Sequence, residues 1–506
     1  MSASGGPNGN DGAGPQRHGT DPQHGASSRG GSSRGGSSRA GPRVVIVGGG
    51  ISGLASAFRV REAVPDASLT VIEKQPDAGG IARSDEIDGY VVDRGPNGFL
   101  TNVPESVELA RAVGLEDDLA PATDAAKHRM LFYRGELRSL PTGPAAFLGT
   151  GLLSPLAKAR VALEPFVGRA PADADETVHR FAERRLGRAF ADAFIAPMVL
   201  GITAGDAKLT SVGALFPRLK RLEDEHGGLF RGMLARRREA RAKPDSAGGP
   251  AGPGGRLTSF RDGGIERLID ALREALGPIV RTGSEATRIA AGGDEGGDEG
   301  ARYRVVLDDG EVVPADVLIV ATPAFVAAKL LADVLPEATD DLEAIPYAGV
   351  RVLGLGYARE HIPRPLDGFG FLVPRGQGVR MLGCLWTSTL FPWQAPEGKA
   401  LLRVIAGGVP DPEFVHLSDD DALQAVRDDL ETTMGITAEP EMVHHVRWEK
   451  AIPQYWRGHG ERVARIMAAA GARPGLHLTG NAYHGIGVND CSRDALRVAE
   501  AVRASI

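Results

Sequence analysis

Residues 43–58 read RVVIVGGGISGLASAF, which is the strongest indication of fold in the sequence. An apolar run, a glycine-rich turn and a helical pattern follow one another, which predicts a strand, a tight turn and a helix. Gly48 permits the turn, Gly50 lets the backbone approach a pyrophosphate, and Gly53 lets the helix pack on the strand. The residues that we expect to surround the phosphates are Gly48, Gly49, Gly50, Ile51, Ser52 and Gly53.

A second apolar strand ends on an acid. The run SLTVIEK at residues 68–74 places Glu73 twenty positions after Gly53. There its carboxylate can accept hydrogen bonds from both ribose hydroxyls of an adenosine. A lone glycine motif is weak evidence, but here the strand, the helix and the acid occur in the expected order. The sequence therefore predicts a dinucleotide-binding βαβ unit, which by itself suits NAD or FAD.

A glycine pair follows this acid closely. The run KQPDAGGIARS at residues 74–84 predicts a compact loop near the bound phosphates, where the Arg83 guanidinium suits a pyrophosphate. A surface turn with a solvated arginine is the alternative. The cofactor contacts that we predict in this loop are Lys74, Gly80, Ile81, Arg83 and Ser84.

Two later turns favour FAD. In VDRGPNGFLTN, residues 92–102, glycines and a proline fix a tight turn whose amides can face a flavin edge. A plain loop is the alternative. Near the C-terminus, LTGNAYHGIGVND at residues 478–490 puts a glycine turn at a helix N-terminus, whose dipole stabilises negative charge on a reduced flavin. A simple helix start, capped by Asn489 or Asp490, is compatible with that role.

Composition limits the other functions. The 506 residues are enough for two or more domains, and the net charge of -7 argues against a general nucleic-acid binder. Two cysteines are too few for a disulfide framework, and neither cysteines nor histidines have metal-ligand spacing, so we predict no metal site. The sequence has neither a GxSxG elbow nor a P-loop. Without a signal peptide or an apolar run of spanning length, a reducing, cytoplasmic setting fits best.

The pattern along the chain predicts an α/β protein whose nucleotide-binding fold opens and closes the sequence, with other domains inserted. The predicted segments are a disordered tail (1–42), the first part of the FAD-binding domain (43–104), a helical insertion (105–242), a flexible linker (243–255), the second part of the FAD-binding domain (256–330), a substrate-binding sheet domain (331–440) and the C-terminal part of the FAD-binding domain (441–506).

Longer runs carry a family resemblance. The stretches AAKHRMLFYRGELRSLPTGPAAFL, GRLTSFRDGGIERLIDAL, DGFGFLVP, RWEKAIPQYWRGH and LTGNAYHGIGVNDC resemble the oxygen-dependent porphyrinogen oxidases of haem synthesis, within the flavin amine oxidase superfamily. That family acts on protoporphyrinogen IX or coproporphyrinogen III. The similarity covers residues 43–506. It implies a Rossmann-like FAD domain of the p-hydroxybenzoate-hydroxylase type, an inserted α+β substrate domain and a helical domain.

The resemblance also implies site residues. Arg129 matches an arginine that meets a propionate, Leu372 and Leu385 match leucines that clamp a pyrrole ring, and Ile405 matches a large apolar position opposite them. Without the resemblance, an internal salt bridge is the alternative for Arg129, and ordinary core positions are the alternative for the leucines. The remaining predicted FAD contacts are Gly95, Pro96, Asn97, Gly98, Ala286, Ala321, Trp448, Gly480, Asn481, Ile486, Gly487 and Val488.

The implied reaction removes hydride from a porphyrinogen and passes it to the flavin, with molecular oxygen as the final acceptor and hydrogen peroxide as a product. We assign no catalytic acid or base. An amine oxidase or carotenoid desaturase on the same fold is one alternative, which the low aromatic content of 5% disfavours. A Rab-escort-like carrier without redox chemistry is another. The apolar stretch at residues 140–166 suits a peripheral membrane contact, an active-site lid or packing between domains. A homodimer is compatible with the sequence.

Overall fold

The computed structural model describes residues 41–171, 174–242, 255–292 and 300–506. The predicted tail at 1–42 lies outside these ranges except for its last two residues, and the predicted linker at 243–255 lies outside them except for Gly255. Residues 41–506 belong to a single unit.

A parallel sheet forms around the stretch that opens the described chain. Its five strands run in the order β10 (Val280–Arg281), β2 (Ser68–Ile72), β1 (Arg43–Val47), β14 (Val317–Val320) and β20 (Leu476–Leu478). Side chains of β1 alternate between two apolar cores: Val44 and Ile46 pack on one face, and Val45 and Val47 on the other. Both faces are covered, which explains why β1 and β14 are almost continuously apolar.

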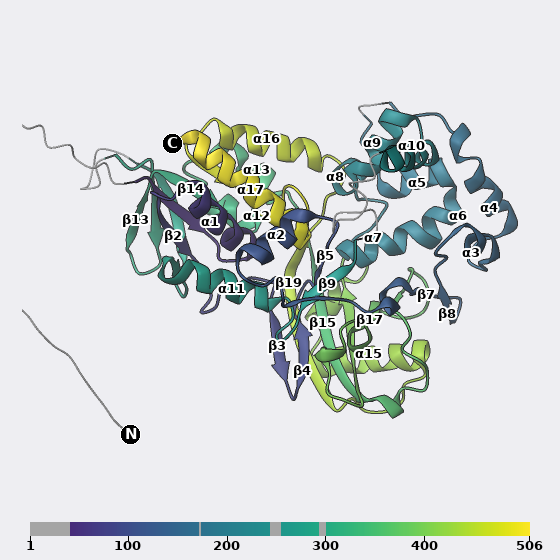
Figure 1. Ribbon diagram of the computed structural model, residues 1–506. Coiled ribbons are helices and arrows are strands. Elements are labelled where there is room, and N and C mark those ends of the chain that lie inside the picture. Colours follow the sequence, from purple (N-terminus) through teal and green to yellow (C-terminus); the bar gives the residue numbers. More distant parts are fainter. Residues whose placement is uncertain (1–40, 172–173, 243–254, 293–299) are drawn as a thin grey trace, which may run out of the picture. The chain divides into compact units, whose positions relative to one another are not determined.

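Different layers cover the two faces of this sheet. Helices α1 (Ile51–Ala63), α11 (Glu266–Leu276) and α17 (Val488–Ser505) contribute to the core on one face, and α1 contacts α17 (Figure 1). The other face meets the small sheet β11 (Ala286–Ala291), β12 (Tyr303–Leu307) and β13 (Val312–Ala315), together with α12 (Ala324–Leu330), α13 (Thr339–Glu343) and α16 (His459–Gly471). The predicted Rossmann-like α/β fold is confirmed.

A second, seven-stranded sheet is mixed. Its order is β19 (Met442–Pro453), β15 (Tyr347–Ala358), β18 (Lys399–Gly407), β17 (Met381–Trp386), β16 (Gly370–Leu372), β7 (Arg129–Tyr133) and β8 (Glu136–Ser139). One face shares an apolar core with α15 (Asp419–Met434), which lies against the sheet in Figure 1.

The structure changes three of the predicted boundaries. β7 and β8 lie inside the stretch 105–242 that we predicted to be a helical insertion, and β7 pairs in parallel with β16. β19 lies in the predicted C-terminal FAD segment, 441–506, but pairs with β15. Helix α13 lies within 331–440 yet packs on the nucleotide-binding fold. Strand pairing over such distances leaves no local trace in the sequence, because each strand keeps the same apolar alternation whichever sheet it joins.

Two smaller sheets lie beside these. The hairpin β3 (Ser84–Ile87) and β4 (Tyr90–Asp93) packs on the seven-stranded sheet, where a Cβ atom on Gly354 would come within 2.7 Å of the Val92 side chain. Tyr90 and Val92 share a core with Leu401 of β18. A three-stranded sheet consists of β5 (Phe99–Leu100), β9 (Leu257–Phe260) and β6 (Leu119–Pro121).

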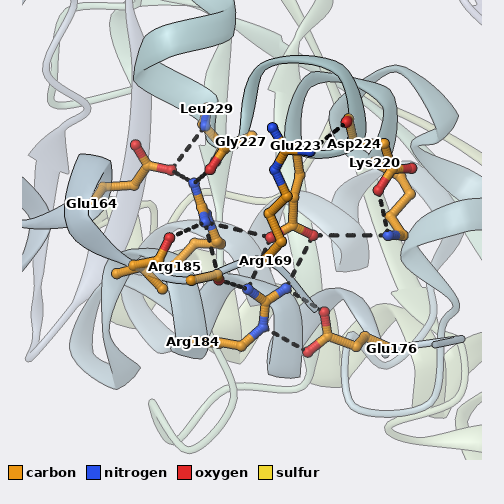
Figure 2. Close-up of polar contacts among 12 residues, drawn as sticks. Glu164, Arg169, Glu176, Arg184, Arg185, Lys220, Glu223, Asp224, Gly227 and Leu229 are labelled. Carbon is orange, nitrogen blue, oxygen red and sulfur yellow. Dashed lines mark hydrogen bonds and ion pairs between the residues drawn. The ribbon is translucent and has the colours of Figure 1, made fainter. Parts of the chain in front are cut away.

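The helical part of the insertion has its own core. Its elements are α3 (Pro144–Gly149), α4 (Pro155–Ala162), α5 (Val178–Leu186), α6 (Arg188–Phe190), a π-helical turn (Ala191–Ile195), α7 (Ala196–Thr203), α8 (Val212–Leu215), α9 (Pro217–His226) and α10 (Leu229–Ala242). Within the residues that are described, no helix is both long and apolar enough to cross a bilayer. Figure 2 shows buried ion pairs that link these helices, with Arg185 and Glu164 fully enclosed.

Candidate functional site

The glycine turn between β1 and α1 has the geometry that the sequence predicts. Gly48 has a φ of +109°, and its amide donates to the Ile72 carbonyl oxygen over 2.8 Å. A Cβ atom on Gly53 would lie 1.8 Å from the Gly48 oxygen, so only glycine fits there. A Cβ atom on Gly50 would meet no atom within 4 Å. The outer side of the turn is therefore open, and the first N–H groups of α1, from Ile51 onward, are available to an anion.

Glu73 ends the second strand next to this turn. One of its carboxylate oxygens accepts the Gly49 amide over 2.7 Å and the other accepts the Gln75 amide over 2.8 Å. Its carbonyl oxygen accepts the Ser284 amide over 3.0 Å, just before β11 begins at Ala286. The acid is thus held in a fixed orientation with Ala286 nearby, while the side chain of the adjacent Lys74 is exposed.

The Gly79–Gly80 loop contacts the glycine turn directly. The Gly79 amide donates to the Gly49 oxygen over 2.8 Å, and Gly79 forms a β-bridge with Gly50. A Cβ atom on Gly80 would be 3.3 Å from the Gly50 Cα atom. The predicted proximity of this loop to the phosphate turn is therefore present in the structure.

Arg83 and Ser84 already have protein partners. Arg83 pairs with Glu266 over 3.1 Å and with Asp77 over 3.4 Å. The Ser84 hydroxyl donates to the Asp93 carboxylate over 2.6 Å. Ser84 can therefore act on a cofactor mainly by orienting Asp93, whereas the guanidinium of Arg83 has donors beyond those two bonds.

The turn at residues 95–98 is tightly enclosed by backbone. A Cβ atom on Gly95 would lie 2.2 Å from the Ile81 oxygen, and one on Gly98, whose φ is +152°, would lie 2.4 Å from the Thr258 oxygen. The Asn97 side-chain nitrogen is buried and has no acceptor among the described residues. The indole nitrogen of Trp448 donates to the Arg94 oxygen over 3.1 Å, which places Trp448 beside this turn. The turn, with Pro96 at its centre, thus offers the Asn97 side-chain amide as a donor without an acceptor among the described residues.

The C-terminal turn lies between β20 and α17. Gly480 and Gly485 have φ values of +127° and +130°, and Gly487 precedes the helix, which begins at Val488. The Tyr455 hydroxyl donates to the Asn481 oxygen over 2.6 Å and accepts the Gly485 amide over 2.9 Å. This tyrosine joins the two ends of the turn that leads into α17, whose first amide groups have no acceptor within the helix.

The turn has the expected cap. The Asp490 carboxylate accepts the Gly487 amide over 3.2 Å, as the cap alternative predicted. The other predicted cap, Asn489, instead donates from its side chain to the Leu100 oxygen over 3.1 Å. Capping by Asp490 leaves Ile486 free to contact a ligand, so the two interpretations of this turn hold together.

Unpartnered polar atoms test whether a dinucleotide fits. Ala321 follows the last residue of β14 and lies against Gly48. The hydroxyl of the next residue, Thr322 Oγ1, is buried without a partner among the described residues, as is Asn97 Nδ2. Leaving such groups unpaired costs about 1–3 kcal/mol each. The path from Glu73 past the α1 N-terminus to the turn at 95–98 and the α17 N-terminus therefore fits an adenosine, a pyrophosphate and an acceptor-rich ring.

The four predicted substrate residues lie on one face of the seven-stranded sheet. Arg129, Gly370 and Leu385 are register partners across β7, β16 and β17. In the next row, Leu372 and Ile405 both pair with Gly383. The residues between them in the strands, such as Met130, Phe371 and Cys384, face the core on the opposite side. Residues that are far apart in sequence thus share one surface.

Arg129 has no carboxylate partner. Within the described part of the chain it forms no ion pair, and its guanidinium lies 4.9 Å from the Phe369 ring centroid. Desolvation by the surrounding protein lowers its pKa, although part of the side chain reaches solvent. The internal salt bridge that was the alternative is therefore absent, and the cation is available to an anionic ligand.

Helix α7 covers part of this face. A Cβ atom on Gly201 would lie 2.6 Å from a Leu372 methyl carbon, so the helix lies directly on this leucine. Ile405 joins an apolar cluster with Leu200 and Ala204 of the same helix segment. The helical insertion therefore forms one wall of the site.

Side chains near the C-terminal turn are not suited to proton transfer at neutral pH. Burial raises the pKa of Tyr455 and Tyr483, and it lowers the pKa of His459 to about 4. His459 stacks on the Tyr455 ring, with centroids 4.0 Å apart. Burial thus favours the neutral form of each of these three side chains at pH 7. Within the described ranges, no cluster of metal-ligating side chains occurs.

Sequence reasoning missed Tyr455 and Arg403. Tyr455 lies in the run RWEKAIPQYWRGH but is distant in sequence from the turn that it clamps. Arg403 follows two leucines in an apolar strand, and its partners, the Asp93 and Gly95 carbonyl oxygens, are backbone atoms. A backbone acceptor leaves no residue-type signal, so only the fold could bring these groups together.

Known proteins resemble this chain over most of its length. A coproporphyrinogen III oxidase of Bacillus subtilis is 32% identical over 467 residues, covering 88% of this chain and 95% of that protein. A chloroplastic protoporphyrinogen oxidase of rice is 32% identical over 478 residues, with coverages of 90% and 87%. A crystal structure of a protein from Exiguobacterium sp. 255-15 superposes with a TM-score of 0.77 at 28% identity, covering 92% of this chain and 99% of that one.

The UDP-galactopyranose mutase fold is also similar, with a TM-score of 0.69 at 17% identity, covering 92% of this chain and 96% of that one. A family model described as flavin containing amine oxidoreductase matches residues 51–503. The chain belongs to the family of flavin-containing amine oxidoreductases.

Proposed function

We propose that this protein is an FAD-dependent oxidase that converts protoporphyrinogen IX or coproporphyrinogen III to the porphyrin, with molecular oxygen as the final oxidant. The observation that carries the substrate is Arg129, an unpaired cation in the same sheet row as Leu385. Relatives whose names specify each of these two substrates match most of the chain. Membership of the family supports a flavin cofactor. The glycine turn beside Glu73 supports a dinucleotide, and so FAD in particular.

Three structural elements would hold the cofactor. Glu73 would accept the ribose hydroxyls, and the α1 N-terminus would bind the pyrophosphate. Asn97 Nδ2 and the neighbouring amides would meet the ring edge, which supplies their missing acceptor. When bound, FAD supplies the hydride-accepting and oxygen-reducing chemistry.

The protein's own contribution is binding and orientation. Arg129 would bind a propionate, and the apolar surface of Leu372, Leu385 and Ile405 would hold the macrocycle against the sheet. Helix α7 would exclude water from the same space. The conversion of porphyrinogen to porphyrin comprises three two-electron oxidations, so each turnover to product would consume three oxygen molecules and release three of hydrogen peroxide. No protein side chain need act as an acid or base.

Parallel assays test this proposal. FAD-loaded protein is mixed in air with each porphyrinogen, and porphyrin fluorescence and hydrogen peroxide are followed against protein-free controls. We expect at least one substrate to be oxidised with about three peroxides per porphyrin. A yellow protein that oxidises neither porphyrinogen but releases peroxide with an amine would refute the substrate assignment and support the amine oxidase alternative.

A peripheral membrane contact is a second proposal, which concerns location. In α3, α4 and the turn after it, Leu148, Leu156, Leu163 and Phe166 are 70%, 84%, 54% and 82% exposed. The acid in this segment, Glu164, is buried. Exposed apolar side chains in a segment that itself carries no exposed acid suit an anionic lipid surface.

Sedimentation with vesicles tests this location. Wild-type protein should sediment with vesicles that contain anionic lipid, and Leu156→Glu combined with Phe166→Glu should abolish sedimentation. A second copy of the chain is the competing occupant of this apolar surface. In that case the wild type would form a homodimer without vesicles, and the double variant would be monomeric in analytical ultracentrifugation.

A further inference from the structure

Arg403 is buried on the substrate-facing side of the seven-stranded sheet. Its side chain comes from the middle of β18, and the residue is 4% exposed. Its neighbours Leu402 and Val404 belong to the core on the other face, so Arg403 points away from that core. Its register partners are Leu385 on β17 and Gly354 on β15. The guanidinium therefore leaves the sheet beside a predicted substrate residue.

The guanidinium binds backbone of the turn that we predict to face the flavin. Its Nε donates to the Asp93 carbonyl oxygen over 2.9 Å, and its Nη2 donates to the Gly95 carbonyl oxygen. The intervening Arg94 oxygen accepts the Trp448 indole N–H over 3.1 Å. Three successive carbonyl groups of one strand end are thus fixed by side chains of the seven-stranded sheet.

This arrangement determines which way the turn presents its donors. In a trans peptide the N–H group points opposite to the preceding carbonyl group. The Gly95 amide must therefore point away from Trp448. The same clamp fixes the start of the segment that carries Asn97, whose buried side-chain nitrogen has no acceptor among the described residues. Arg403 and Trp448 therefore fix the backbone of residues 93–95, from which the turn and its unpaired Asn97 side-chain amide continue.

Asp93 provides the second half of the clamp. One of its carboxylate oxygens accepts the Ser84 hydroxyl over 2.6 Å and the Ile265 amide over 3.2 Å. The other accepts the Gln394 side-chain nitrogen over 2.9 Å. The residue is fully buried, and its carboxylate has no direct contact with the Arg403 guanidinium, which binds the carbonyl instead. Asp93 and Arg403 therefore hold one backbone segment from both sides.

We propose that Arg403 is a positioning residue that sets the flavin-facing turn at residues 95–98 from the substrate-binding sheet. This inference deepens the proposed function, and it rests on flavin binding at this turn rather than on which substrate is oxidised. The guanidinium orients the free donors of the turn toward the flavin, and its buried positive charge favours the electron-rich reduced flavin. Because Arg403 is the register partner of Leu385, the same side chain links the substrate wall to the cofactor wall.

The test compares Arg403→Met and Arg403→Lys with the wild type. FAD affinity is measured from flavin fluorescence during titration of apoprotein, and the flavin midpoint potential is measured by dye equilibration. We expect Arg403→Met to raise the Kd for FAD at least about tenfold, since two charge-assisted hydrogen bonds are lost. Its midpoint potential should fall below that of the wild type. Arg403→Lys keeps the charge but not the two-point geometry. We therefore expect a higher Kd for FAD than in the wild type, and a smaller change in midpoint potential than in Arg403→Met.

A matched control lies in the same sheet. Arg351 on β15 is 1% exposed and also donates to two backbone oxygens, those of Val415 and Leu417, far along the chain from the flavin-facing turn. Arg351→Met should bind FAD with the wild-type Kd and potential. Equal losses in Arg351→Met and Arg403→Met would indicate a general folding defect and overturn the proposal.

Unchanged FAD affinity and midpoint potential in Arg403→Met would also overturn it. If Arg403→Met does not fold, the comparison of Arg403→Lys with the wild type decides, and wild-type values in that variant count against the proposal. A wild-type protein that binds FAD but oxidises neither porphyrinogen would refute the proposed function. The FAD affinity and midpoint potential of the variants would still test the positioning role of Arg403.

Discussion

Replacing Glu164 by leucine should destabilise the helical insertion more than any exposed ion-pair change. The Glu164 carboxylate accepts the Leu229 amide over 2.8 Å and the Phe230 amide over 3.1 Å, where α10 begins, and it pairs with Arg185 (Figure 2). Both charged side chains are 0% exposed. The leucine would remove all three contacts and leave a buried guanidinium whose remaining carboxylate, on Glu223, is 3.4 Å away.

The expected cost follows from that geometry. Removing one partner of a buried ion pair typically costs about 3–5 kcal/mol, because the other charge stays desolvated. We therefore expect the free energy of unfolding in urea, followed by circular dichroism, to fall by about this amount in Glu164→Leu. Adding Arg185→Met should restore much of the loss, since both charges are then absent. Glu223 retains Arg184 at 2.9 Å in that double variant.

An exposed pair provides the control. Arg111 and Glu116 are 52% and 57% exposed, so Glu116→Leu should leave the unfolding transition unchanged. A loss below about 1 kcal/mol in Glu164→Leu would show that the buried pair is not an anchor of the insertion. A double variant as unstable as Glu164→Leu alone would contradict this reasoning. It would show that the loss of stability comes from the unpaired amides at the start of α10 rather than from the unpaired Arg185 guanidinium.

Three further predictions concern the site. Gly53→Ala should yield protein without bound flavin, because its Cβ atom would lie 1.8 Å from the Gly48 oxygen, whereas Gly471→Ala, with open space around it, should stay yellow. Arg129→Ala should raise the KM for the porphyrinogen about tenfold or more with a smaller change in kcat, and an unchanged KM would refute the anchor role. His459 has a pKa of about 4 when folded, below its unfolded value of about 6.5, so its contribution to stability is present above pH 6.5 and is lost as the pH falls toward 4. Urea unfolding at several pH values should show a shallower acid-side loss in His459→Phe than in the wild type, and an equal loss would contradict this origin.

The nucleotide-binding fold could be predicted because its signals are local. Strand, glycines, helix and acid occur within residues 43–74. Gly48 is required by its φ of +109°, and Gly53 by its contact with the Gly48 oxygen in the same unit. Backbone that needs glycine leaves a direct mark on the sequence. The turn at 95–98 and the turn before α17 were readable for the same reason.

The second sheet was less predictable. Strand β7 lies in a segment of helical pattern, and its pairing with β16 joins residues 129–133 to residues 370–372. The register that puts Arg129 in one row with Leu385 is set by this pairing, which no local pattern encodes. Arg403 was missed because its acceptors are carbonyl oxygens, which every residue carries. The prediction of Arg129, Leu372 and Leu385 as substrate residues rested on the family resemblance. That they lie on one face of the sheet is seen only in the structure.

Flavin reduction by a porphyrinogen can be observed by mixing it with FAD-loaded protein without oxygen. We expect the absorption band of oxidised flavin to be bleached within a single turnover and to return on admission of air, together with hydrogen peroxide. A flavin that stays oxidised with both protoporphyrinogen IX and coproporphyrinogen III, in protein shown to bind FAD stoichiometrically, would contradict the proposed function.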